Sequence, residues 1–290
     1  MTPESAVTCL RFLHDGALCL LWGGLGFACF LAGRTLVTPL VRLLETAVSV
    51  AVGVVVATSV SALPVQTADI TGHWASVYDV STLHLVAETA VGEALALQVA
   101  TAIMLLLANL LRAYRTSVLI AGLMLCELAL SGHAAEDSGL GGVAHQAVDA
   151  VHVLSGCAWL GGLIPFMLIL RMAAISELQS VSIKAMRRFS TAGHVAVALV
   201  LTSGIVNLWF TVGRLPIHFS SPYDQKLCLK ILAVGLMTAI AIVNRYAFVP
   251  MIRRDGSFAR SLLTYGCATE LVLGAAALGL VASFGLQDPA

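Results

Sequence analysis

Eight mostly apolar stretches, separated by short polar segments, dominate this chain of 290 residues. They cover residues 5–33, 43–65, 83–111, 115–132, 143–171, 185–212, 225–249 and 262–285. About 20 apolar residues in helical form cross the hydrocarbon core of a bilayer, and a spanning helix satisfies its own backbone hydrogen bonds. The sequence therefore predicts an all-α, polytopic transmembrane helical bundle with about eight spanning helices, of which the fourth is short.

The composition agrees with a membrane location. Hydrophobic residues make up 59% of the chain and charged residues 11%, whereas a soluble domain carries about 25% charged residues. The formal net charge is zero, so no overall field favours nucleic acid. We find no repeat and no linker and predict one domain over residues 1–290, in contact with membrane lipid. Because ATP-binding and hydrolase motifs are missing, we expect neither an ATP-driven pump nor an enzyme.

Basic residues predict the orientation of the helices. When the loops are assigned alternately to the two sides, one side receives 12 of the 16 basic residues, and the other receives Arg11, Arg214, Lys226 and Lys230. The basic side should face the cytoplasm. Both termini are then periplasmic, and the chain should be a multi-pass protein of the bacterial cytoplasmic (inner) membrane.

Histidines gather on the predicted outer side. His14, His73, His84, His133, His145, His152 and His218 fall in outer loops or outer helix halves, and His194 lies toward the inside. Imidazole and carboxylate groups are ligands for transition metals. The distribution indicates an outward-facing vestibule that attracts a metal ion.

The stretch 143–171 carries the most informative spacing. His145, Asp149 and His152 stand at positions i, i+4 and i+7, so they project from one face of a helix. Seven residues separate the two imidazoles by about 10 Å along the axis, which favours two successive binding stations. The carboxylate binds the metal directly or fixes a histidine tautomer. In the alternative interpretation the three groups only join neighbouring helices.

Further metal ligands are predicted on other helices. His84 and Glu88 form an i, i+4 pair in the stretch 83–111, although such a pair is also common by chance. His133 follows the stretch 115–132, where it could equally cap a helix end. His14 lies beside Arg11 and Asp15, which can pair with each other and leave the imidazole available.

Soft ligands suggest a possible inner path. Met167, Cys157 and Met104 are candidates for Cu(I), which prefers thiol and thioether ligands. The alternative is that they are ordinary core residues, as methionine and free cysteine in apolar helices usually are. Glu127 and Glu270 lie within predicted spans, where a carboxylate suggests a proton or cation path.

The run SGHAAEDSGLGGVAHQAVDAVHVLSGCAWLGGL, from Ser131 to Leu163, resembles the central signature of the bacterial copper resistance D (CopD/PcoD-like) family. Further similar segments are RRFS at 187–190, Ser203, Gly204 and Asn207, YDQKLCLK at 223–230, and Asn244 with Arg245. The resemblance implies an inner-membrane protein that moves copper between periplasm and cytoplasm, often beside a periplasmic carrier of the copper resistance C type. The family's histidine-rich signature maps onto His133, His145, Asp149 and His152.

Three functions remain open from the sequence. The leading hypothesis is copper transport, as Cu(I) or Cu(II), with outer histidines and carboxylates capturing the ion from the periplasm. A haem b-binding electron-transfer protein is the alternative, because histidines on adjacent helices can ligate haem. The third is a copper-binding assembly factor or sensor that does not move the ion.

Overall fold

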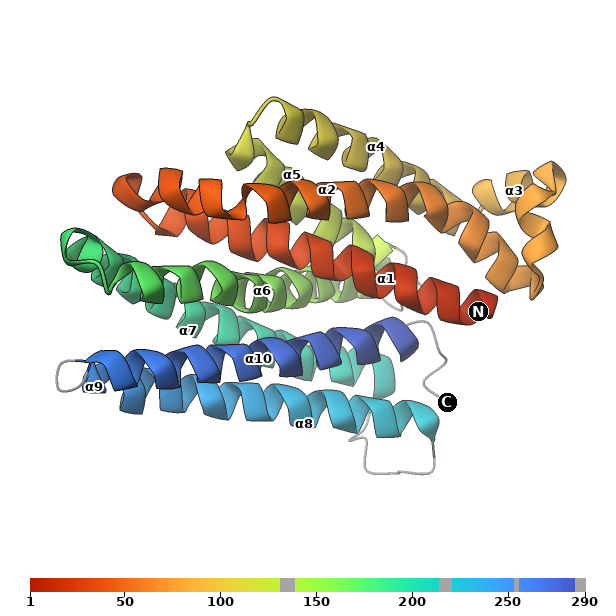
Figure 1. Cartoon of the computed structure of the whole chain (residues 1–290). Coiled ribbons are helices and arrows are strands. Elements are labelled where there is room, and N and C mark those ends of the chain that lie inside the picture. Colours follow the sequence, from red (N-terminus) through yellow and green to blue (C-terminus); the bar gives the residue numbers. More distant parts are fainter. Residues whose placement is uncertain (131–138, 214–220, 253–255, 285–290) are drawn as a thin grey trace.

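The computed structural model of the chain describes residues 1–130, 139–213, 221–252 and 256–284. Within them all regular secondary structure is helical (Figure 1). The main helices are α1 (Pro3–Cys19), α2 (Arg34–Thr71), α3 (Val80–Ala87), α4 (Ala90–Leu110), α5 (Tyr114–Glu127), α6 (Gly139–Met172), α7 (Ser176–Val212), α8 (Pro222–Val243), α9 (Val249–Met251) and α10 (Gly256–Phe284). The prediction of an all-helical bundle is confirmed.

Short helical segments extend or link these helices. The first span continues from α1 through two π-helical segments, η1 (Leu20–Leu25) and η2 (Phe27–Leu31). The 3₁₀ segments η3 (Trp74–Tyr78) and η4 (Leu128–Leu130) follow α2 and α5, and the π-helical η6 (Asn244–Phe248) joins α8 to α9. Among the described residues, seven helices are long and apolar enough to cross a membrane. The predicted fourth span corresponds to α5, which has 14 residues.

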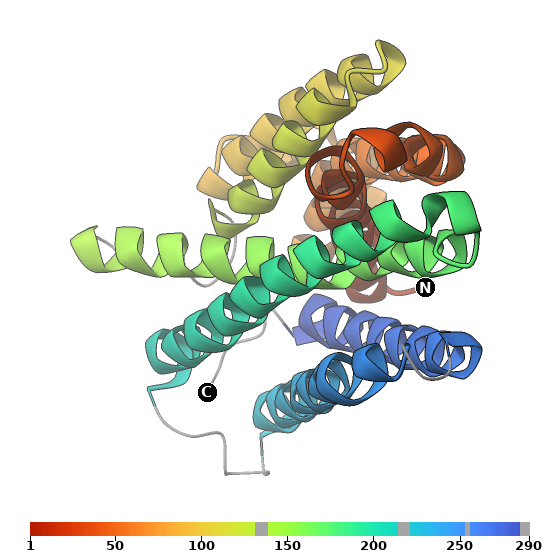
Figure 2. The same ribbon diagram turned by 90° about the vertical axis from the view of Figure 1, so that its left-hand side faces the viewer.

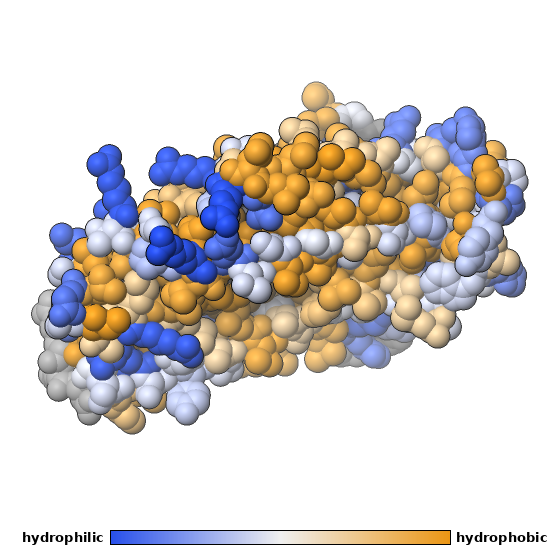
Figure 3. Space-filling view, turned by 45° about the horizontal axis from the view of Figure 1, so that its top comes forward, coloured by the Kyte–Doolittle hydropathy of each residue, from blue (hydrophilic) through white to orange (hydrophobic). Residues whose placement is uncertain are grey.

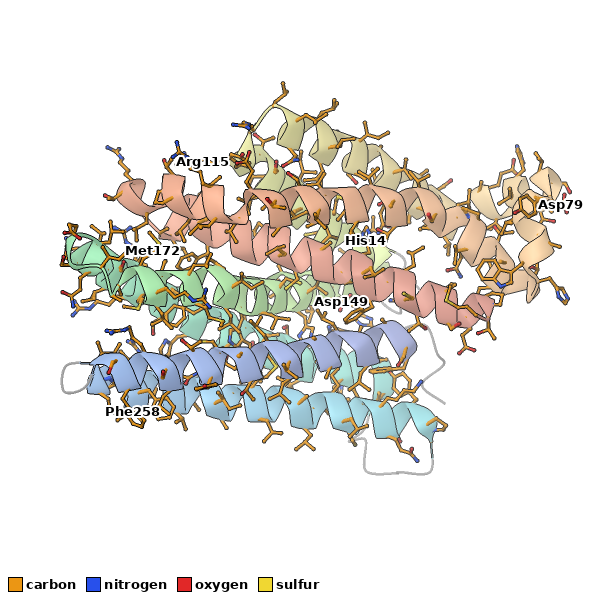
Figure 4. All side chains as sticks on the ribbon, in the orientation of Figure 1. His14, Asp79, Arg115, Asp149, Met172 and Phe258 are labelled. Carbon is orange, nitrogen blue, oxygen red and sulfur yellow. The ribbon has the colours of Figure 1, made fainter. Side chains whose placement is uncertain are left out.

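The helices run back and forth along one bundle. The start of α1 and the end of α10 lie at the same end of it (Figure 1). Arg115 and Met172 lie toward the opposite end, whereas Asp79 lies beyond the bundle on the side of the N-terminus (Figure 4). This arrangement agrees with the prediction that both termini face the periplasm. Apolar side chains form a broad band across the middle of the face in Figure 3.

α6 and α7 lie between two groups of helices. The group of α1, α2, α4 and α5 lies on one side, and the pair α8 and α10 lies on the other (Figures 1 and 2). α6 packs most extensively against α7 and also contacts α5 and α10. α6 is therefore the element that can connect the two halves of the bundle.

Glycines allow the first span to cross α6 at very short distance. A side chain at Gly23 would collide with the backbone at Cys157 and Gly161, and one at Gly161 would collide with the backbone of Cys19. Small residues four apart permit such close packing of membrane helices. The crossing fixes the position of α6 against η1, and the Cys19 thiol contacts the Cys157 carbonyl at 3.6 Å.

The predicted third span differs from the structure. Instead of one helix over 83–111, the chain forms α3 and α4 with a break at Glu88 and Thr89. The Thr89 hydroxyl accepts a hydrogen bond of 3.2 Å from the Gly92 amide and so begins α4 as an N-cap. The α3 helix contacts α2, η3 and α4, and it lies beside the end of α2 and beyond the ends of α8 and α10 (Figure 1).

Candidate functional site

The polar stripe of α6 faces α7. His145 stacks on the ring of Phe210 with 4.8 Å between centroids. Asp149 accepts a hydrogen bond of 2.9 Å from the Asn207 amide. These contacts place the predicted functional face of α6 inside the protein, where Asp149 lies within the length of the bundle (Figure 4).

His152 continues the same stripe. Its Nδ1 lies 3.1 Å from the Ser203 hydroxyl and 3.0 Å from the Val200 carbonyl. Gly204 lets the ring pack closely against α7, since a Cβ atom at position 204 would lie 3.1 Å from the His152 Cε1 and would push the ring away by a few tenths of an ångström. The Ser203–Gly204 pair therefore both binds and accommodates this imidazole.

The two helices carry matched spacings. His145, Asp149 and His152 on α6 stand at i, i+4 and i+7, and so do their antiparallel partners on α7. Those partners are Phe210, Asn207 and Ser203. This match was not predicted, although the spacing of Ser203, Asn207 and Phe210 in the sequence was a signal that could have revealed it.

α8 adds a positive charge to the site. Lys230 is half-buried and lies within electrostatic range of both Asp149 and His152. A carboxylate and an ammonium group close together at membrane depth compensate each other's charge. The site thus combines two imidazoles and a carboxylate of α6 with a lysine of α8, and α7 supplies their polar partners.

A buried carboxylate extends this polar region along α6. Glu270 on α10 accepts hydrogen bonds from the Trp159 indole at 3.2 Å and from the Asn244 amide at 2.8 Å. Trp159 lies seven residues beyond His152, on the same face of α6. The stripe therefore continues from α7 and α8 toward α10.

The remaining predicted ligands lie apart from this stripe. His14 is buried against α2, with its Nδ1 2.8 Å from the Thr58 hydroxyl, and its Nε2 has no hydrogen-bond partner. His84 on α3 and Glu88, which follows α3 directly, contact each other at 3.4 Å with both side chains exposed. His133 lies outside the described residues. In the part of the chain that the structure describes, no three His, Cys, Asp or Glu residues are grouped closely enough to hold a metal ion.

The soft candidates do not form a common path with the stripe. Met104 is 53% exposed on the outer surface of α4, so its thioether faces the surroundings of the bundle. Cys157 is buried where α6 crosses α1. Met167 packs against an apolar cluster that contains Leu163 and Phe166. Hydropathy cannot separate lipid-facing from interior positions, which is why all three remained candidates.

Comparison with known protein families shows to which family the chain is related. The family model for the copper resistance protein D-like N-terminal domain matches residues 1–143, and the model for copper resistance protein D matches residues 183–284. The chain belongs to the copper resistance D family. This confirms the resemblance seen in the sequence and makes the chain a copper-related, multi-pass protein of the inner membrane.

Individual relatives agree with this assignment. The inner membrane protein YebZ of Escherichia coli is 29% identical over 284 residues, which is 97% of each chain. Copper resistance protein D of Pseudomonas syringae pv. tomato is 35% identical over 59% of this chain and 58% of its own length. Copper transport protein CutJ of Bacillus subtilis is 28% identical over 64% of this chain and 36% of its own length. No solved structure matches the chain.

Proposed function

We propose that this copper resistance D protein carries copper ions from the periplasm into the cytoplasm along the seam between α6 and α7. The observation that supports this most directly is the stripe of two imidazoles and a carboxylate on a buried face of α6, matched by polar groups of α7. Ionisable groups at this depth are costly and usually mark a substrate path. The ion is the transported substrate, and the protein acts as a transporter rather than an enzyme.

Capture begins at the exposed outer end. The His84–Glu88 pair at the end of α3 offers copper a nitrogen and an oxygen ligand in water. A separate periplasmic carrier of the copper resistance C type would deliver the ion to this end. His145 then receives the ion first in the bundle, and His152 receives it next, because it lies further along α6.

Movement of the ion requires the seam to open. In the described conformation Asp149 is bonded to Asn207, and His152 is bonded to α7. Copper must therefore replace these bonds one at a time, and each released α7 group returns to its partner once the ion has passed. The cost of separating the helices at each step is thus offset by metal–ligand bonds.

Lys230 controls the charge of the site in this proposal. Its ammonium group compensates Asp149 when no ion is present. A copper cation that approaches Asp149 repels the ammonium group, and the long side chain can move away toward the end of α8. The charge of Asp149 is then compensated by Lys230 when the site is empty and by the copper cation when the site is occupied.

The proposal is tested by copper accumulation in cells that produce the protein. Cellular copper should rise with external copper relative to cells that contain the His152→Ala variant at equal membrane abundance. The purified protein should contain no haem b, and a Soret band in its absorption spectrum would support the electron-transfer alternative instead. An unchanged copper content would favour an assembly factor or sensor.

A further inference from the structure

An apolar groove lies beside the α6 crossing, between the first span, α5, α6 and α7. Its volume is about 210 Å³, and its lining includes Trp22, Phe27, Phe30, Leu119, Trp159 and Gly193. Part of the wall belongs to η1 and η2, and π-helical turns of this kind often occur at functional sites. Trp159 lines this groove and also belongs to the α6 stripe, whereas His145, Asp149 and His152 do not line it.

The groove opens to the side of the bundle. Phe30 is 52% exposed and Leu119 is 63% exposed, and in a membrane both would face lipid. Trp159, in contrast, is buried and forms part of the inner wall. An elongated apolar group can therefore enter from the bilayer and reach the indole without crossing water.

Two arginines lie at the mouth of the groove. The Arg115 guanidinium lies 5.7 Å above the Phe30 ring. Arg188 donates a hydrogen bond of 3.4 Å to the Leu31 carbonyl. The ion pairs formed among the described residues are His84–Glu88 and Arg112–Glu45, so neither arginine at the groove is neutralised by a carboxylate there.

We propose that the groove binds an anionic phospholipid of the inner leaflet. One acyl chain lies in the groove, and the headgroup phosphate is bound between Arg115 and Arg188. Guanidinium groups suit this role because their planar donors match phosphate oxygens, and basic pockets between helices on the cytoplasmic side recognise anionic headgroups. The positive-inside rule places these two arginines at that side.

Tryptophan fluorescence can report occupancy of the groove directly. The chain has four tryptophans, and the substitutions Trp74→Phe and Trp209→Phe leave Trp22 and Trp159 as reporters inside the groove. This protein is reconstituted in phosphatidylcholine vesicles that contain a fixed fraction of brominated lipid. Brominated phosphatidylglycerol should quench more strongly than brominated phosphatidylcholine at the same fraction. The preference should fall roughly thirtyfold when Arg115→Gln and Arg188→Gln are combined.

Matched variants distinguish lipid binding at this groove from a general effect of surface charge. Arg42→Gln removes an exposed arginine outside the groove and should keep the preference. A side chain at Gly193 meets nothing within 4 Å, so Gly193→Leu should fill the groove and reduce quenching, whereas Gly53→Leu on the exposed face of α2 should not. Equal quenching by both lipids would refute the proposal. The proposal would also be refuted if the preference for phosphatidylglycerol survived the combined Arg115→Gln and Arg188→Gln change. The same holds if Arg42→Gln alone removed the preference to the same extent. None of these results depends on copper transport.

Discussion

The carboxylate of Asp149 on α6 accepts a hydrogen bond of 2.9 Å from the side-chain amide of Asn207 on α7. This bond joins the charged group of the α6 stripe to the helix that it faces. It lies between the contacts that α7 makes with His145 and with His152. Asn207 thus supports the α6 stripe from α7, a contact that the sequence did not predict.

The first prediction concerns this pair. Asn207→Ala should destabilise the folded protein by about 1–3 kcal/mol, because it removes a donor from the half-buried carboxylate of Asp149. Asp149→Asn should lower copper transport to an intermediate level, since it removes the charge and keeps the shape. The double variant should show non-additive effects on detergent unfolding, and strict additivity would mean that the hydrogen bond contributes nothing.

Gly204 should be essential for the position of the His152 ring. The added methyl group of Gly204→Ala would approach the ring to 3.1 Å, and overpacking of this kind costs about 1–3 kcal/mol. Copper transport should fall, while Gly235→Ala on α8, where a Cβ meets nothing within 4 Å, should leave it unchanged. Equal transport by the two variants would show that the ring tolerates displacement.

Glycine-to-alanine changes should destabilise the protein at the crossing of the first span and α6 but stabilise it on an exposed helix face. Gly23→Ala and Gly161→Ala should each destabilise the protein by about 1–3 kcal/mol or prevent its insertion, because backbone atoms occupy the space. Gly53→Ala, on an exposed face of α2, should stabilise it slightly through higher helix propensity. Thermal unfolding in detergent measures all three, and a stable Gly23→Ala variant would contradict the described crossing.

Asp79 should make α3 sensitive to acid. Its carboxylate accepts hydrogen bonds from the Ser81 and Thr82 hydroxyls at 2.6 Å, which hold the pKa of Asp79 below its ordinary value of 3.8. A lowered pKa means that the stabilisation is complete above pH 3.8 and is lost as the pH falls through the folded-state value. Hydrogen exchange of residues 80–87 should therefore gain protection as the pH rises through this range, beyond the intrinsic pH effect. Asp79→Asn can still cap the helix and should remove this dependence.

The sequence predicted those features that depend on hydropathy and on spacing within one helix. Long apolar runs located the spans, and the i, i+4, i+7 spacing of His145, Asp149 and His152 identified a buried stripe. The break at Glu88 and Thr89 was not predicted, because apolar residues continue on both sides and the cap is formed by one hydroxyl.

Contacts between helices were harder to predict. The partners Phe210, Asn207 and Ser203 depend on the register of α7 against α6, which neither helix specifies alone. The position of Met104 on the outer surface of α4 shows the same limit, because lipid-facing and interior side chains of a membrane helix are equally apolar. The roles of His14, His84, Glu88 and His133 in copper binding stay predictions.

Copper flux into vesicles that contain the purified protein tests the central proposal most directly. The parent protein, His152→Ala and a control, His73→Ala, are reconstituted at equal density and orientation, and internal copper is measured over time. His73 is exposed between α2 and η3, so its variant should transport like the parent. His152→Ala should lose copper-dependent transport, because it removes the imidazole at the inner station of the α6 stripe. Transport by His152→Ala at the parental rate would show that copper does not pass along the seam between α6 and α7.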